Sequence, residues 1–79
     1  MGKDFIERAV IEKTIQEILE MQHRRTLACG RRLVPNLTPD DMLQPNDFPQ
    51  LENHPDFRYE EGVLEGIRTV EMALRALNP

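Results

Sequence analysis

The first third of the chain repeats its apolar residues at helical spacing. No proline or glycine interrupts residues 4–29, and strong helix formers dominate there. Gly30 does not end the pattern, because the next three residues keep its phase and one glycine costs a helix only about 1 kcal/mol. Pro35 is the stop signal. The pattern predicts one amphipathic helix over about residues 4–33, with a contact stripe made of Ile11, Ile15, Ile18, Gln22, Cys29 and Leu33.

The last third of the chain predicts a second long helix, over about residues 56–77, with two adjacent stripes. The first stripe is large and apolar and consists of Tyr59, Val63, Ile67, Val70, Leu74 and Leu77. The second consists of small residues, Gly62, Gly66, Thr69, Ala73 and Ala76. One antiparallel neighbour covers one stripe, so two stripes indicate two neighbours at different distances. One neighbour is the first helix, and the other is either the intervening segment or a helix from a second copy of the chain. The alternative is that the glycines simply tolerate an exposed face.

The segment between the helices, residues 34–55, contains five of the six prolines and is called the strap below. Its prolines exclude a long helix or a central strand. Its apolar side chains are too many for a flexible linker and predict a segment that lies on the helices: Leu37, Met42, Leu43, Phe48 and Leu51. Thr38, followed by Pro39 and two aspartates, is typical of a helix start and predicts a short helix over about residues 39–43.

Length and composition set the expected architecture. The 79 residues have a mass of 9.2 kDa, and a single domain of that size buries only about 60% of the surface that its unfolded chain exposes. Aromatic residues make up 5% of the chain, which limits the core further. The predicted fold is one all-α domain over residues 1–79, an antiparallel helical hairpin with a proline-rich strap and a short connector helix. Two such hairpins would close a four-helix bundle as a homodimer.

The net charge of −4 is distributed unevenly. Residues 40–61 hold seven acids and one arginine, whereas residues 21–39 hold no acid and form a basic cluster of Arg24, Arg25, Arg31 and Arg32. This cluster is the candidate site for a phosphate or an acidic peptide. A structural interpretation pairs it with Asp40, Asp41 and Asp47 of the strap. A nucleic-acid interpretation is weaker, because the pI is about 5.1 and no aromatic residue accompanies the arginines.

Other polar residues suggest weaker hypotheses. Glu20 and His23 form an E-x-x-H pair of the kind found in metal-binding bundles, but both point well away from the apolar stripe, so a solvated surface is favoured and no metal or cofactor is expected. Gln22 and Arg25 lie in or beside the stripe, where polar residues fix the register of packed helices. A rival interpretation places them in a small polar pocket with Tyr59. Glu60 and Glu71 flank the large stripe and are positioned to pair with arginines of the first helix.

These patterns indicate a non-catalytic protein. No catalytic triad, phosphate loop or facing carboxylate pair can be assembled, and a single Cys29 supports no internal disulfide. No secretion signal or membrane span is recognised, which predicts a cytoplasmic location. We expect an adaptor or regulatory subunit that binds itself and another protein, through the arginine cluster and the acidic strap. Nucleic-acid binding by the arginine cluster and metal binding at Glu20 and His23 are the alternatives.

Overall fold

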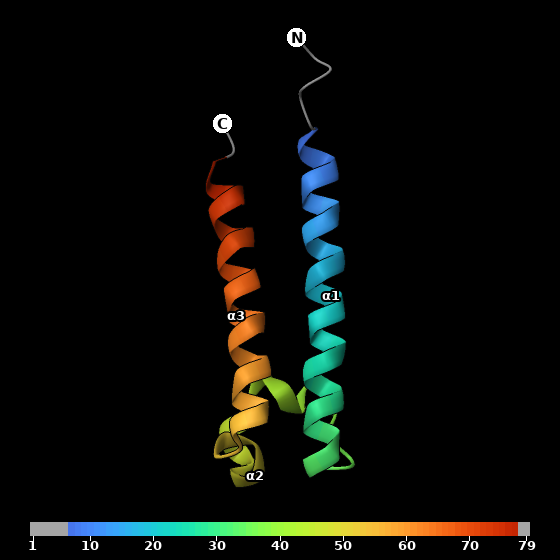
Figure 1. The fold of residues 1–79 in the computed structure, drawn as a ribbon, viewed down its shortest axis with the longest axis vertical. Helices are drawn as coiled ribbons and strands as arrows, with labels where there is room; N and C mark the ends of the chain where they lie inside the picture. Colours follow the sequence, from blue (N-terminus) through green and yellow to red (C-terminus); the bar gives the residue numbers. More distant parts are fainter. Residues whose placement is uncertain (1–6, 78–79) are drawn as a thin grey trace.

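The computed structural model describes residues 7–77, and every regular element in that range is helical (Figure 1). The two long helices are α1 (Arg8–Leu33) and α3 (Pro55–Ala76). Between them the strap contains two short 3-10 helices and one helical turn: η2 (Asp41–Leu43), η3 (Pro45–Asp47) and α2 (Pro49–Glu52). The prediction of an all-α chain in which one long helix packs on another is confirmed.

The two long helices lie side by side and run in opposite directions (Figure 1). The start of α1 and the end of α3 lie at the same end of the pair, and the strap lies at the other end. As predicted, α1 continues through Gly30, and its last turn closes when the Val34 N–H donates to the Gly30 carbonyl at 2.8 Å, just before Pro35. The predicted helix start near residue 4 and the stop signal at residues 78–79 lie outside the described residues.

Polar side chains close the turn that leads into η2 and cap the start of α3, whereas η3 and α2 begin without a side-chain cap. The Asp41 N–H donates to Thr38 Oγ1 at 3.2 Å, and the Thr38 N–H donates to Asp41 Oδ2 at 2.9 Å, so the two residues cap each other. The predicted helix over residues 39–43 is nevertheless only the 3-10 turn η2. Gln44 precedes Pro45, and a residue before proline is driven out of the α conformation, so no full α-helical turn can follow. At the start of α3, the Asp56 N–H donates to His54 Nδ1 at 3.2 Å.

The hydrophobic core lies at the strap end of the helix pair. Leu51 is 0% exposed and Phe57 is 1% exposed, and both belong to a cluster with Cys29 of α1 and Leu37 of the strap. Partly buried apolar side chains surround this cluster: Leu27, Leu33, Val34, Met42 and Phe48. The strap therefore lies on the helices and completes the core.

Gly30 allows this close packing between α1 and the strap. A Cβ atom at this position would lie 2.5 Å from Leu37 Cδ2 and 3.2 Å from Phe57 Cε1. Any side chain there would displace the strap leucine or the aromatic ring. The glycine that appeared in the sequence as a possible helix stop is instead a buried contact inside the helix.

The contact stripe of α3 differs from the prediction. The residues that face α1 or the core include Phe57, Glu60, Leu64, Glu71 and Leu74. Three members of the predicted large stripe are instead mostly exposed, at 68% for Tyr59, 51% for Val70 and 73% for Leu77. The core holds Phe57 toward α1 and the strap. The face of α3 that contacts α1 is therefore turned about the helix axis by roughly 100°, one residue position, from the predicted face.

The contact stripe of α1 is corrected in the same way. Gln22 and Cys29 are buried as predicted, but Ile18 remains 42% exposed. Thr26 takes a buried position that the apolar pattern did not assign, because its hydroxyl donates to the Gln22 carbonyl of the preceding turn at 2.8 Å. Polar groups therefore occupy the centre of the contact between the long helices.

Candidate interaction surfaces

A polar network, which we call the polar clasp, joins the middle of α1 to α3, and its residues Gln22 and Thr26 are buried. It contains Gln22, Thr26 and Arg25 of α1 and Glu60 of α3. Gln22 Nε2 donates to Glu60 Oε1 at 2.7 Å and to the Glu60 carbonyl at 3.1 Å. Arg25 Nη2 lies 3.5 Å from Glu60 Oε2, which confirms the predicted pairing of Glu60 with an arginine of the first helix. The clasp satisfies each buried polar group and fixes the axial register of the two helices.

The competing hypothesis of a polar pocket with Tyr59 is wrong. Tyr59 is exposed, and the acceptor that Gln22 and Arg25 share is Glu60, the next residue along the helix. Further from the strap, Gln16 Nε2 donates to Glu71 Oε2, and Arg8 Nη2 donates to the Leu74 carbonyl at 2.7 Å. These polar contacts hold the part of the helix pair that lacks a hydrophobic core.

The clasp makes stability depend on pH. The hydrogen bond from Gln22 lowers the pKa of Glu60 below its ordinary value of 4.5, burial acts in the opposite direction, and Arg25 lowers the pKa further. A carboxyl whose pKa is lower in the folded chain stabilises the fold above its unfolded pKa and loses that effect as pH falls through the folded pKa. We expect Glu60→Gln to reduce the free energy of unfolding at pH 7 by about 1 kcal/mol.

The difference between the wild-type chain and Glu60→Gln should shrink as the pH falls from about 4.5, the ordinary pKa of a glutamate in the unfolded chain, through the lower pKa of Glu60 in the folded chain. Urea unfolding of both chains between pH 7 and pH 3 measures this difference. A difference that stays constant over that range contradicts an ionised Glu60 in the clasp.

The four arginines of the predicted cluster differ in the contacts that they make within the fold. Arg25 belongs to the clasp, and Arg31 Nε donates to the Leu37 carbonyl at 2.8 Å, which helps to hold the strap on α1. Arg24 and Arg32 are exposed. Within residues 7–77 no ion pair joins any of the four arginines to Asp40, Asp41 or Asp47, so the expected pairing with the strap is not found. All four arginines are therefore exposed, and Arg25 and Arg31 also make contacts within the fold.

The structure places the two residues of the E-x-x-H pair in different surroundings. Glu20 is exposed, whereas His23 is half-buried and bonds to Arg68 of α3. In the described part of the chain no group of three or more histidine, cysteine, aspartate or glutamate side chains is arranged to hold a metal ion.

One broad side of the helix pair carries large apolar side chains that no other part of residues 7–77 covers. The strap lies over the other side, where His23 and Leu27 of α1 share a cavity with Glu61 and Glu65 of α3. At 100° per residue, the positions on the opposite side of each helix are those of the exposed residues Ile18 and Met21 on α1 and Tyr59, Val70 and Leu77 on α3. We call this set the uncovered apolar face.

The small stripe borders the uncovered apolar face on the outer surface of α3. Its five residues, Gly62, Gly66, Thr69, Ala73 and Ala76, are all exposed. A Cβ atom added at Gly62 or Gly66 meets nothing within 4 Å. The strap therefore does not cover this stripe, and the prediction that it could is wrong, because the strap is anchored on the other side of the pair by the core.

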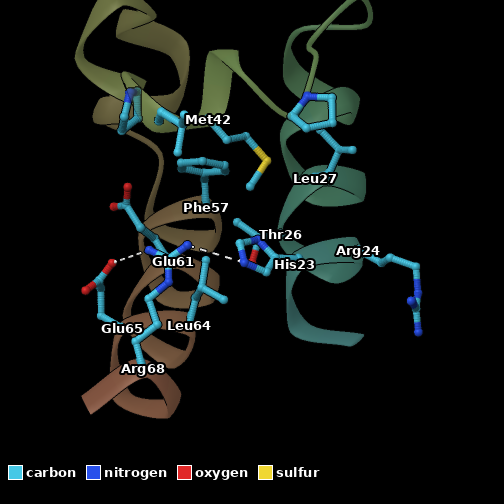
Figure 2. Close-up of a pocket in the computed structure, with 13 residues that line it drawn as sticks. His23, Arg24, Thr26, Leu27, Met42, Phe57, Glu61, Leu64, Glu65 and Arg68 are labelled. Carbon is cyan, nitrogen blue, oxygen red and sulfur yellow. Dashed lines mark hydrogen bonds and ion pairs between the residues drawn. The ribbon is translucent and has the colours of Figure 1, made fainter. Parts of the chain in front are cut away.

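The other side of the pair contains a cavity of about 400 Å³ under the strap (Figure 2). Its walls are mainly apolar and include Leu27 of α1, Met42 of the strap, and Phe57 and Leu64 of α3. Polar groups close one edge, where Arg68 Nη2 donates to His23 Nε2 at 3.3 Å and Arg68 Nη1 lies 3.1 Å from Glu65 Oε2. Sequence reasoning missed this cavity, since it depends on where the strap lies.

Comparison with protein-family models, with curated proteins and with solved structures finds no match for the chain. Among residues 7–77, neither long helix is apolar enough over a sufficient length to cross a membrane. The uncovered apolar face and the cavity under the strap are therefore the features that bear on function.

Proposed function

We propose that the chain is a small non-catalytic protein-interaction module, an adaptor or regulatory subunit of the cytoplasm, that acts as a homodimeric helical hairpin. In the dimer two hairpins pack through their uncovered apolar faces and form a four-helix bundle. The observation that supports this proposal is the exposure of large apolar side chains on one side of both long helices, among them Ile18, Tyr59 and Val70. Contiguous exposed apolar surface on a small protein is typical of an interaction site.

The composition of this face supports a second copy as the partner that covers it. The face runs along both long helices and ends beside a stripe of small residues that includes Gly66, where a neighbouring backbone can approach closely. Both helix pairs would contribute the same stripes, as a two-fold symmetric interface requires. A bundle of four helices also encloses apolar side chains that a flat pair leaves in water.

A charge placed on the uncovered apolar face should dissociate the dimer. We expect Val70→Glu to weaken self-association by at least about a hundredfold, because burying an unpaired carboxylate in an interface costs on the order of 3 kcal/mol or more. Met72→Glu is the matched control, since Met72 is exposed on the same helix only two residues away but points to the strap side. The measurement is the melting temperature as a function of protein concentration, which rises with concentration for a dimer.

The wild-type chain and Met72→Glu should both show the concentration dependence, and Val70→Glu should lose it while keeping its helical circular dichroism. If the two glutamate variants behave alike, the uncovered apolar face is not the dimer interface.

A further inference from the structure

We propose that the cavity under the strap is a binding site for an uncharged, mainly apolar small molecule that carries one hydrogen-bond acceptor, such as an amide or ketone oxygen. This site lies on the opposite side of the helix pair from the uncovered apolar face, so both surfaces can be occupied at once. The inference adds a ligand site to the proposed interaction module, and it does not depend on whether the chain dimerises.

The size and walls of the cavity fit a small apolar molecule. Its volume of about 400 Å³ lies within the range of ligand pockets, and an apolar cavity of roughly 150 Å³ already accepts a benzene ring. A molecule with two fused rings therefore has room in it. Phe57 and Leu64 form one wall and Leu27 faces them from α1 (Figure 2). Met42 enters from the strap, and its flexible thioether side chain adapts to the shape of a bound group.

The charged side chains around the cavity are paired with one another, which favours an uncharged ligand. Arg68 Nη1 lies 3.1 Å from Glu65 Oε2, and Arg58 Nη1 lies 2.9 Å from Glu61 Oε1. Arg24 also borders the cavity, but Figure 2 shows its side chain pointing away. A ligand carboxylate or ammonium group would have to break one of these pairs or enter the apolar part without a counter-charge. Both alternatives reduce the binding free energy.

The polar edge of the cavity supplies hydrogen-bond donors for one oxygen atom. A guanidinium group has five N–H donors, and within residues 7–77 those of Arg68 bond to Glu65 and His23 alone. The remaining N–H groups can donate to an oxygen of a molecule that packs against the apolar walls. Every buried side-chain nitrogen and oxygen of the described residues already has a partner, so the cavity requires no second polar group of its ligand.

Three naphthalene derivatives of equal size test the class of ligand. Of these probes 2-naphthamide is uncharged, 2-naphthoate is an anion and 2-naphthamidine is a cation, and all three share one ring system. Methyl NMR of the full chain, labelled at its methionine methyl groups, reports where each probe binds. Met42 lines the cavity, whereas Met21 lies on the uncovered apolar face. An aromatic probe that lies beside a methyl group shifts its proton signal, so one titration distinguishes the two surfaces.

We expect 2-naphthamide to shift the Met42 signal in a saturable way and to leave the Met21 signal unchanged. The two charged probes should bind at least about tenfold more weakly, because their charge gains no partner in the cavity. Arg68→Met should weaken the binding of 2-naphthamide several-fold more than that of 2-methylnaphthalene, which has no acceptor. Arg75→Met is the matched control and should change neither affinity, because Arg75 also pairs with a glutamate of α3 but does not line this cavity.

Four results would overturn the proposal. Absence of any Met42 shift at millimolar 2-naphthamide excludes the cavity as a ligand site, and a shift of Met21 alone places the probe on the uncovered apolar face. A charged probe that binds as tightly as 2-naphthamide contradicts an uncharged ligand. Equal losses of 2-naphthamide and 2-methylnaphthalene affinity in Arg68→Met contradict a hydrogen bond from Arg68. None of these results depends on self-association, which Val70→Glu tests separately.

Discussion

Replacing Phe57 by alanine is expected to lower the free energy of unfolding by about 3–5 kcal/mol, the usual cost of removing a buried aromatic ring. The ring is 1% exposed and belongs to the cluster that joins α1, the strap and α3. The total stability of a chain of this length is only roughly 4–12 kcal/mol. Urea unfolding followed by circular dichroism should therefore show a transition at much lower urea concentration, or no folded baseline.

Leu43→Ala serves as the control, because Leu43 belongs to the strap but is 73% exposed. Its effect should stay within about 0.5 kcal/mol, as is usual for exposed positions. Equal losses for the two substitutions would contradict a core placed at the strap end and centred on Phe57.

The second large effect is expected at Gly30, where adding one methyl group should destabilise the fold although alanine is the better helix former. Helix propensity alone would stabilise Gly30→Ala by about 1 kcal/mol. The new Cβ, however, would lie 2.5 Å from Leu37 Cδ2 and 3.2 Å from Phe57 Cε1. Overpacking of this kind costs typically about 1–3 kcal/mol, and both neighbours are nearly fully buried, so we expect a net loss of about 1–2 kcal/mol.

Ala28→Gly calibrates the propensity of the same helix, because Ala28 is exposed and lies only two residues from Gly30. It should cost about 1 kcal/mol with no change in packing. If Gly30→Ala instead raises the free energy of unfolding by the amount that Ala28→Gly lowers it, the strap does not pack on α1 at this point.

The helices could be predicted from the sequence because proline defines their limits locally at the strap end. Pro35 ends α1, the strap prolines prevent a long helix, and Pro55 begins α3 behind the His54 cap. The strap's position on the helices was also predictable, since Leu37 and Leu51 are apolar residues that a flexible linker would expose.

The rotation of α3 could not be predicted, because two stripes of this helix have equally regular spacing. The face that contacts α1 is a third one, with Glu60 and Leu64, and it is set by Phe57, which lies at the very start of the helix and outside both predicted stripes. Its burial requires the strap, Gly30 and α3 to meet, and that is a contact between distant parts of the chain. Thr26 was missed for a related reason, since a polar residue becomes suitable for a buried position only once Gln22 and Glu60 are beside it.

The same rotation determines which surfaces remain for partners. Because α3 uses Phe57 and Leu64 for the interior, Tyr59 and Val70 of the predicted contact stripe lie on the outside. The strap covers only one side of the pair, where it forms the cavity. The molecule therefore has two different surfaces: a mainly apolar cavity under the strap on one side and an extended apolar face on the other.

Light scattering of the purified wild-type chain, with the mass determined across a dilution series, tests self-association most directly. We expect twice the chain mass of 9.2 kDa at micromolar concentration and a fall toward 9.2 kDa on dilution. A mass of 9.2 kDa throughout the series, up to concentrations well above micromolar, would contradict a dimer built on the uncovered apolar face.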